Sequence, residues 1–207
     1  MRQDGRLARG ERTRTAVLDQ ALALATVSGL DGLSLSQVAD ALGVSKSGLF
    51  AHWRSKLQLQ LAVIDHARQQ WTDLVIRPAL AEPAGVRRLW AAHDRRLAFY
   101  EAGTLPGGCF FGNAHFEFNA RPGVIRDRLA EEQSAWMTFL TGVATEALEL
   151  GELRPGTDPA QLAYLIEALG VCTVMRPEPA SFRYARLALH AHLRTVAIDP
   201  DNLPEPK

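Results

Sequence analysis

The sequence has few of the features that mark several common classes of protein. Its two cysteines, Cys109 and Cys172, lie far apart, which excludes a disulfide framework and a zinc-binding cysteine spacing. No run approaches the ~18 apolar residues of a transmembrane helix, and no signal-peptide stretch follows the Arg-rich N-terminus. A phosphate-binding glycine loop, a GxSxG motif and an HExxH motif are also lacking. We therefore expect a cytoplasmic protein that is not an enzyme and that binds no metal or other cofactor.

Aromatic residues are also few, at 7% of the 207 residues, and Val, Ile and Thr rarely alternate. Leu and Ala recur throughout a chain that is 47% hydrophobic, which favours an all-helical fold with a sizeable core. The net charge is zero, but residues 1–60 hold eight Lys or Arg against five Asp or Glu, and residues 61–207 hold fifteen against eighteen. This asymmetry favours a basic N-terminal module on an acidic body.

Caps and helix breakers divide the chain into a series of expected helices. Residues 1–10 look disordered, and Gly29 ends the first helix. Pro78 is expected to end the fourth helix, and Asp158 to cap the helix that Pro159 opens. The expected helices span about residues 11–28, 35–42, 46–52, 56–77, 83–103, 109–119, 122–151, 159–176 and 179–197.

A helix-turn-helix is expected at residues 34–53. Ser34 and Gln37 have the spacing of a capping box, which fixes the start of the first short helix. Gly43 ends that helix in the left-handed conformation that glycine adopts easily, and Val44 is expected to fill the corner between the two helices.

The second short helix is expected to have one apolar face and one polar face. Ser45 caps it, and Leu49 and Trp53 anchor it four residues apart. The remaining surface consists of small, polar, cationic and aromatic residues: Lys46, Ser47, Gly48, Phe50, Ala51 and His52. Such a surface suits the major groove of DNA, and a glycine that costs about 1 kcal/mol of helix stability suits close approach to a base. The alternative is a plain helical hairpin within a core.

Residues 11–60 resemble the DNA-binding domain of the TetR family of bacterial regulators. The resemblance lies in Gly32-Leu33-Ser34 through Gly43-Val44-Ser45-Lys46, then in Leu49-Phe50 and Ser55-Lys56. A looser similarity to some of the family's regulatory domains runs from Gly107-Gly108-Cys109-Phe110 to Arg121-Pro122-Gly123. The resemblance implies a homodimer that binds a partly palindromic operator and releases it when a small molecule enters the C-terminal domain.

The resemblance also implies which side chains contact DNA. Ser36, Lys46 and Gly48 match positions that reach base edges, and Ser47 lies on the same surface. The positions that match backbone contacts are Ser34, Phe50, His52 and Lys56. Phe50 stands where the family usually has tyrosine, so a hydrogen bond from a phenol to phosphate is lost.

Physical chemistry supports some of these assignments independently. Lys56 lies at a helix N-terminus, where amide donors and the helix dipole favour an anion. Arg12 and Arg14 on the preceding arm can add phosphate or minor-groove contacts. For Arg2 and Arg6, a solvated arginine-rich terminus is an equal alternative.

A two-helix reader makes too few contacts for tight specificity, so we expect a dimer on two half-sites about one helical turn apart. The expected helices at 159–176 and 179–197 have continuous apolar stripes. The residues assigned to a dimer interface on these stripes are Leu162, Leu165, Ile166, Leu169, Leu189 and Leu193. Core packing within one chain is the alternative for these stripes, and the resemblance favours dimerisation.

A ligand site is expected where aromatic side chains gather with a few polar groups. The first candidates lie on the short helix at 109–119: Cys109, Phe110, Asn113, His115 and Phe116. The second candidates come from later helices: Trp136, Phe139, Tyr164 and Cys172. The alternative is that these side chains only fill the core.

Cys109 raises a second functional hypothesis, that of a thiol-based redox or electrophile sensor. It follows two glycines at an expected helix start, where the helix dipole favours a reactive thiolate. A buried and inert cysteine is the alternative.

The sequence as a whole predicts a ligand-responsive transcriptional regulator, most simply a repressor. Its DNA-binding domain is expected at 1–55, its ligand-binding and dimerisation domain at 56–198, and a loose tail at 199–207. Its expected partners are double-stranded operator DNA, a small and mostly apolar inducer, and a second copy of the chain. An all-helical enzyme with a vestigial reader is a further alternative.

Overall fold

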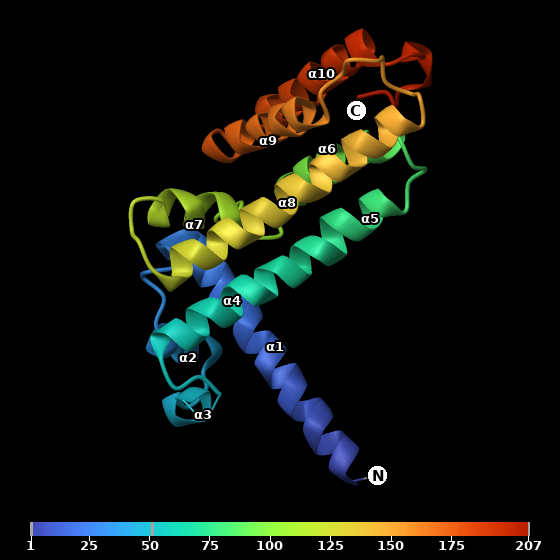
Figure 1. The fold of residues 1–207 in the computed structure, drawn as a ribbon. Coiled ribbons are helices and arrows are strands. Elements are labelled where there is room, and N and C mark those ends of the chain that lie inside the picture. The colour runs from blue at the N-terminus through green and yellow to red at the C-terminus, as the bar shows by residue number, and fades with distance from the viewer. Residues whose placement is uncertain (1, 51, 207) are drawn as a thin grey trace. The chain divides into compact units, whose positions relative to one another are not determined.

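The computed structural model describes the backbone of residues 2–50 and 52–206 and the side chains of residues 13–49 and 52–206. Figure 1 traces its helices along the chain. They are α1 (Arg2–Ser28), α2 (Leu35–Leu42), α3 (Lys46–Phe50), α4 (Lys56–Trp71), α5 (Arg77–Leu80), α6 (Val86–Glu101), α7 (Phe110–Phe118), α8 (Val124–Glu149), α9 (Pro159–Met175) and α10 (Pro179–Val196). Over these residues, β-structure is confined to one isolated antiparallel bridge between Leu153 and Ala197. The expected all-helical fold is confirmed.

The N-terminal helix is longer than expected. Residues 1–10 were expected to be disordered, yet α1 already begins at Arg2. Gly5 and Gly10 weaken a helix by only about 1 kcal/mol each, and the Arg, Gln, Leu and Ala residues around them are good helix formers. Two glycines at this spacing therefore do not prevent a continuous helix.

The expectation that Pro78 ends the fourth helix is wrong. After α4 the chain enters a π-helix, Thr72–Ile76, in which the amide of Arg77 donates to the carbonyl of Thr72. The helical path then continues through Pro78 in α5. Proline lacks an amide donor and its ring crowds the preceding turn. The wider π turn has room for the ring, so the helix does not have to stop.

Residues 200–203, part of the segment expected to be a loose tail, pack against the protein. Residues Pro200–Asn202 form a short 3-10 helix, and Leu203 is buried. The side chain of Arg87 donates from Nη2 to Oδ1 of Asn202 at 3.0 Å. One apolar side chain and one hydrogen bond are enough to order a tail that looks polar and proline-rich.

The chain forms two compact units that do not follow the expected boundary at residue 55. The first unit is Met1–Gln69 with Leu105–Ala130, and the second is Gln70–Thr104 with Glu131–Lys207. The first unit includes α4 as far as Gln69. Leu59, Val63 and Ile64 are fully buried there, and Gln60 donates from Nε2 to the carbonyl of Leu30 at 2.9 Å. The first unit includes α7 because side chains of that helix bind the end of α1.

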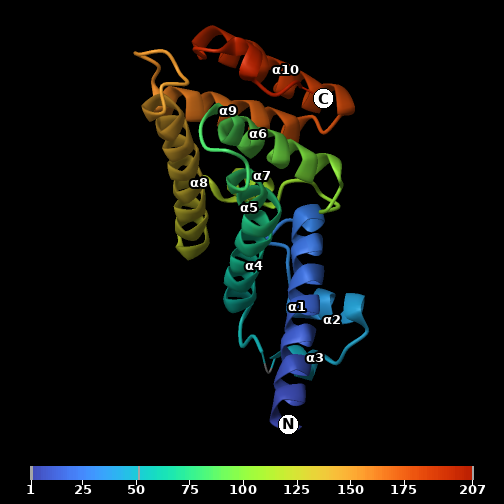
Figure 2. The same cartoon turned by 90° about the vertical axis from the view of Figure 1, so that its right-hand side faces the viewer.

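In the second unit, α6, α9 and α10 lie side by side (Figure 2). Leu97 on α6 packs against Phe182 and Ala185 on α10, with Tyr100 and Leu169 around them. No helix in the described part of the chain is long and apolar enough to cross a membrane.

Candidate nucleic-acid interface

The first short helix of the candidate interface, α2, is fixed at both ends as expected. Ser34 is its N-cap: Oγ accepts the amide of Gln37 at 3.2 Å and donates to Oε1 of the same residue at 2.9 Å. At the other end, Gly43 has φ = 64°, and the amide of Val44 donates to the carbonyl of Ala39 at 3.1 Å. Open space surrounds the place where a Cβ on Gly43 would lie, so the left-handed backbone is the reason for the glycine.

The corner between α2 and α3 differs from expectation in one residue. Val44 was expected to fill the corner, but its side chain is exposed. Ala39 on α2, in contrast, is fully buried. Alanine is small, so this position of α2 leaves room for a neighbouring helix without a larger side chain between them.

The polar face of α3 is exposed and its apolar face is buried. Leu49 and Trp53 each keep only 3% of their surface exposed, which confirms them as the anchors. Ser45 caps the helix, because its Oγ accepts the amide of Gly48 at 3.4 Å. The predicted DNA contacts Lys46, Ser47 and Gly48 are exposed on this element, and His52 is exposed in the turn after it. The geometry needed to present them to a groove is therefore in place.

Gly48 is open to solvent and to added side-chain atoms. A Cβ on Gly48 would meet only Oγ of Ser45, at 3.3 Å. The backbone of the free protein therefore tolerates alanine, apart from a small movement of Ser45. A requirement for glycine at this position would come from a bound partner.

The other predicted DNA contacts have differing environments. Ser34 and Ser36 are half-buried, while Arg14 is exposed and its guanidinium lies over the ring of Trp53, 5.6 Å from the centroid. Arg14 thus ties α1 to the end of the reading segment as well as adding charge. The predicted contacts of Arg12 and Phe50 fall on side chains outside the described residues.

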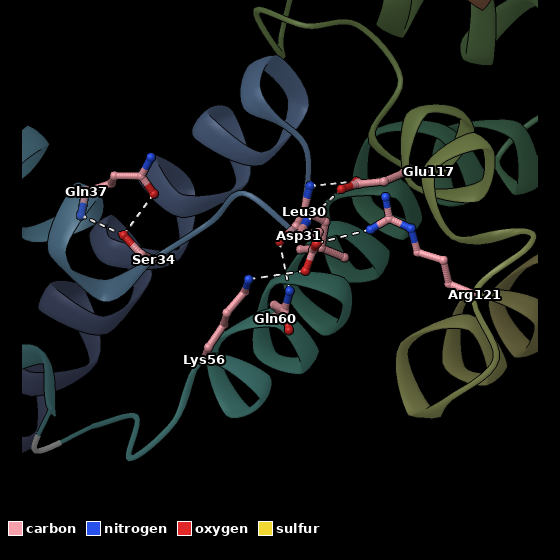
Figure 3. A network of polar contacts seen from close by, with 8 residues as sticks. All are labelled: Leu30, Asp31, Ser34, Gln37, Lys56, Gln60, Glu117 and Arg121. Atoms are coloured by element: carbon pink, nitrogen blue, oxygen red, sulfur yellow. Dashed lines mark hydrogen bonds and ion pairs between the residues drawn. The ribbon is translucent and has the colours of Figure 1, made fainter.

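Lys56, at the N-terminus of α4, is part of a polar network that the sequence did not predict (Figure 3). Its Nζ donates to Oδ1 of Asp31 at 3.2 Å, and Arg121 donates to Oδ2 of the same carboxylate at 3.1 Å. The hydrogen bond from Lys56 is the main reason that the pKa of Asp31 lies below its usual value, with the charges of Lys56 and Arg121 adding to it. Asp31 is therefore ionised at neutral pH and lies beside two cations.

The predicted ligand residues of α7 do not share one environment. Cys109 and Phe110 are buried and His115 is half-buried, but Phe116 is 54% exposed, so its assignment to an enclosed site is wrong. Phe116 follows Phe110 by six residues, which places it on a different face of the helix. Asn113 donates from Nδ2 to the carbonyls of Thr26 and Gly107, so its amide has a structural role.

Cys109 lies at the helix start, as predicted, but its sulfur faces the protein. Its Sγ accepts the amide of Gly112 at 3.3 Å and caps α7. The residue is buried. This is the environment of a structural cysteine, since reactive thiols are accessible to solvent.

Two of the later ligand candidates, Trp136 and Phe139, belong to an aromatic cluster in the second unit. Their rings stack at 5.4 Å between centroids, and Trp136 meets Trp71 edge-on at 5.3 Å. Trp71 in turn contacts the rings of Phe99 and Tyr100. The prediction included Trp136 and Phe139 of this cluster and missed Trp71, Phe99 and Tyr100.

A buried ion pair lies within this aromatic cluster. Arg96 donates from Nη1 to Oε2 of Glu167 at 2.6 Å, and its guanidinium lies 5.8 Å from the ring centroids of both Tyr100 and Trp136. Trp136 and Gln133 also donate to the Glu167 carboxylate. Burial raises the pKa of Glu167, but Arg96 and these donors outweigh it, so that the pKa lies below its usual value. A glutamate among the apolar residues of α9 was the sequence signal for this pair.

The remaining ligand candidates, Tyr164 and Cys172, are exposed on α9, so their assignment to an enclosed site in one chain is wrong. Tyr164 is 70% exposed. It follows the buried Leu162 by two residues, which turns it about 200° away from the protein interior.

The predicted dimer stripe is mostly core. Four of its residues are buried within the protomer, and only Leu165 and Leu169 are half-buried. The assignment of Leu162, Ile166, Leu189 and Leu193 to an interface is therefore wrong, because α9 and α10 pack against each other through them. The outer faces of the two helices instead expose another apolar set: Tyr164, Cys172, Met175, Tyr184 and Leu187.

Two family models match this chain. The model described as "Bacterial regulatory proteins, tetR family" matches residues 17–63, which contain α2, α3 and the start of α4. The model described as "Tetracyclin repressor-like, C-terminal domain" matches residues 85–181. The two matches fall on the candidate reading helices and on most of the remaining helical body.

Several known proteins are similar to this chain over most of its length. The HTH-type transcriptional regulator SrpR of Pseudomonas putida is 26% identical over 152 residues, which cover 73% of this chain and 68% of SrpR. A crystal structure of a TetR transcriptional regulator from Chloroflexus aurantiacus has a TM-score of 0.83 and 28% identity, covering 93% of this chain and all of that one. The crystal structure of AibR with isovaleryl coenzyme A and operator DNA shares the fold, with a TM-score of 0.64, 19% identity and coverage of 87% and 95%.

Proposed function

Because the chain belongs to the TetR family of bacterial regulatory proteins, we propose that it is a transcriptional repressor whose operator binding is relieved by a small, mostly apolar molecule. It acts in the cytoplasm as a homodimer on a palindromic operator. It has no enzymatic activity of its own. The observation that supports this function most directly is the segment formed by α3 and the turn after it, which buries Leu49 and Trp53 and exposes Lys46, Ser47, Gly48 and His52.

The reading surface combines two kinds of DNA contact. Lys46, Ser47 and Gly48 face base edges in the major groove, with Ser36 beside them. Lys56, His52, Ser34 and the arginines of α1 contact the phosphate backbone, which sets register and adds most of the salt-dependent affinity. AibR, which shares the fold, was crystallised with operator DNA, and that likeness supports the same use of the fold.

The homodimer forms through the exposed outer faces of α9 and α10. Tyr164, Met175 and Tyr184 are more than 60% exposed on these helices, and exposed large apolar side chains are common at protein interfaces. Two reading units then bind half-sites about 34–36 Å apart, or one turn of DNA.

The small molecule binds against the aromatic cluster of the second unit, formed by Trp71, Phe99, Tyr100, Trp136 and Phe139. Several aromatic rings together with one ion pair of fixed orientation have the composition of a ligand site. The ligand favours the conformation in which the reading helices do not fit DNA, and so shifts the population away from the bound form.

The environment of Cys109 argues against the thiol-sensor alternative. Cys109 is buried and its sulfur accepts an amide of its own helix, which leaves little access for an oxidant or electrophile.

The test of this function is selection of duplexes from a random pool by the purified protein, followed by titration of the selected duplex. We expect a palindromic consensus with half-sites one helical turn apart, and affinity at least 1,000-fold above that for random DNA. Lys46→Ala is the variant expected to lose binding. Lys46→Arg, which keeps the charge, is its matched control. Enrichment of no common sequence, or equal affinity for random duplex, would contradict the proposal.

A further inference from the structure

One carboxylate on α7 binds two consecutive amides of the turn between α1 and α2. The amide of Leu30 donates to Oε2 of Glu117 at 2.8 Å, and that of Asp31 donates to Oε1 at 2.9 Å. Figure 3 shows the Glu117 side chain reaching this turn from α7. Hydrogen bonds to an ionised acceptor are about twice as strong as neutral ones, so the turn is firmly attached to α7 at this point.

The turn is also fixed from its other side. Gln60 on α4 is buried and donates to the carbonyl of Leu30, so side chains hold both backbone polar groups of this residue. Gly29, with φ = 84°, ends α1, and a Cβ there would lie 2.9 Å from Oε1 of Glu117. Glycine therefore provides both the left-handed turn and the close approach of the carboxylate.

Asp31 links this turn to a proposed DNA contact. The same residue whose amide binds Glu117 accepts a hydrogen bond from Nζ of Lys56 through its side chain. An ammonium group has three donors, so Lys56 can keep Asp31 and still donate to a phosphate. The place of the Asp31 backbone therefore decides where the Lys56 ammonium points.

We propose that Glu117 is a positioning residue for DNA binding: it holds the α1–α2 turn so that Asp31 directs Lys56 toward a phosphate. The inference rests on the proposed function, because it takes Lys56 as a phosphate contact. A contact that is oriented before DNA arrives avoids the ordering cost that a mobile lysine would incur on binding. Since Glu117 is part of α7, a displacement of that helix reaches Lys56 through Glu117 and Asp31.

The test compares Glu117→Gln with the wild type and with Glu149→Gln, which changes an exposed glutamate at the end of α8. Glutamine keeps the shape but loses the charge and one acceptor oxygen. We expect the Kd for the selected duplex to rise about threefold to tenfold, as loss of one oriented phosphate contact would produce. Amide hydrogen exchange at Leu30 and Asp31 should become faster, while Glu149→Gln behaves as wild type.

A merely structural role of Glu117 makes a different prediction. Glu117→Gln would then lower the melting temperature but leave the Kd and its salt dependence unchanged, and that result would overturn the proposal. Under the proposal, the slope of log K for DNA binding against log salt is smaller for Glu117→Gln than for the wild type, and approaches the slope of Lys56→Met. In the Lys56→Met background, Glu117→Gln should have little further effect, whereas full additivity would overturn the route through Lys56.

Asp31→Asn is the second variant, chosen because its side chain is half-exposed and its loss does not endanger folding. We expect it to weaken binding as much as Glu117→Gln does. Tighter binding, as expected if Asp31 only repels phosphate, would overturn the positioning role. Failure of the wild type to select any duplex would instead contradict the proposed function. This outcome is distinguishable from a failure of the positioning role of Glu117, because it is seen with the wild type alone.

Discussion

Two ion pairs, one in each compact unit, lie in opposite environments. In the first unit, Lys56 and Asp31 pair at 3.2 Å with side chains that are 50% and 51% exposed. In the second unit, Arg96 and Glu167 pair at 2.6 Å with only 4% and 15% exposed. An exposed pair contributes little and exchanges partners easily, whereas breaking a buried pair is strongly destabilising. The first arrangement suits a surface that must accept phosphate, and the second suits a body whose internal geometry is fixed.

The largest expected effect comes from breaking the buried pair. Glu167→Gln should lower the free energy of unfolding by about 3–5 kcal/mol, because the Arg96 guanidinium stays buried after its counter-charge is removed. Urea or thermal denaturation measures the change. Glu149→Gln, an exposed control, should change it by less than about 0.5 kcal/mol. Equal free energies of unfolding for the two variants would show that the buried pair contributes no more to stability than an exposed glutamate does.

The same pair should produce an acid-dependent stability. The folded-state pKa of Glu167 is lowered, so its contribution is present above the ordinary glutamate pKa and is lost as the pH falls through the folded-state value. The wild type should therefore lose stability relative to Glu167→Gln as the pH is lowered below about 4.3. A constant difference between the two proteins from pH 7 to pH 3 would contradict this assignment.

The next effect is on DNA binding and leaves folding untouched. Lys46→Ala should weaken binding of the selected duplex by about 1–3 kcal/mol and relax base preference at one position of each half-site. Lys46 is exposed, so the melting temperature should not change. Competition binding against duplexes with single base changes measures both quantities. If Lys46→Ala lost as much affinity for random DNA as for the selected duplex, Lys46 would contact the DNA phosphate backbone and not a base.

Gly48→Ala should separate stability from recognition. The free helix has room for the methyl group, so the variant should gain up to about 1 kcal/mol of stability from higher helix propensity. Its affinity for the selected duplex should nevertheless fall, because the added methyl group occupies space that a base in the major groove takes in the complex. Thermal denaturation and titration on the same preparation decide the matter, and a variant that binds DNA as well as the wild type would remove Gly48 from the interface.

The smallest expected effect on stability comes from breaking the exposed pair. Lys56→Ala should change the free energy of unfolding by less than about 1 kcal/mol. It should lower the slope of log K against log salt by about one and weaken all duplexes alike. A loss of stability as large as that of Glu167→Gln would erase the contrast between the two units.

Local signals in the sequence predicted most of the helices. The cap at Ser34, the left-handed glycine at position 43 and the Asp158-Pro159 start of α9 are each decided within a few residues, and the structure has all three. The division of α3 into a buried and an exposed face followed in the same way, because four-residue spacing alone separates the two faces.

The failures involve long-range contacts. The Glu117 carboxylate binds amides 86 and 87 residues earlier in the chain, and no local pattern marks such a partner. Whether an apolar stripe faces its own core or a second copy was also undecidable from periodicity, and the stripe with Leu162 and Leu189 proved to be core. Pro78 was misjudged for a related reason, because a change of helix type depends on the surrounding packing.

The π-helix at Thr72–Ile76 has a consequence for comparing this chain with its relatives. A π turn is equivalent to one inserted residue in a regular helix, and each residue rotates the helix by about 100°. An ungapped alignment with a relative that lacks the turn would therefore match residues after position 76 to the wrong helical face. A single-residue gap between Thr72 and Ile76 restores the correspondence, and residue transfer to or from homologues beyond this point should begin with that gap.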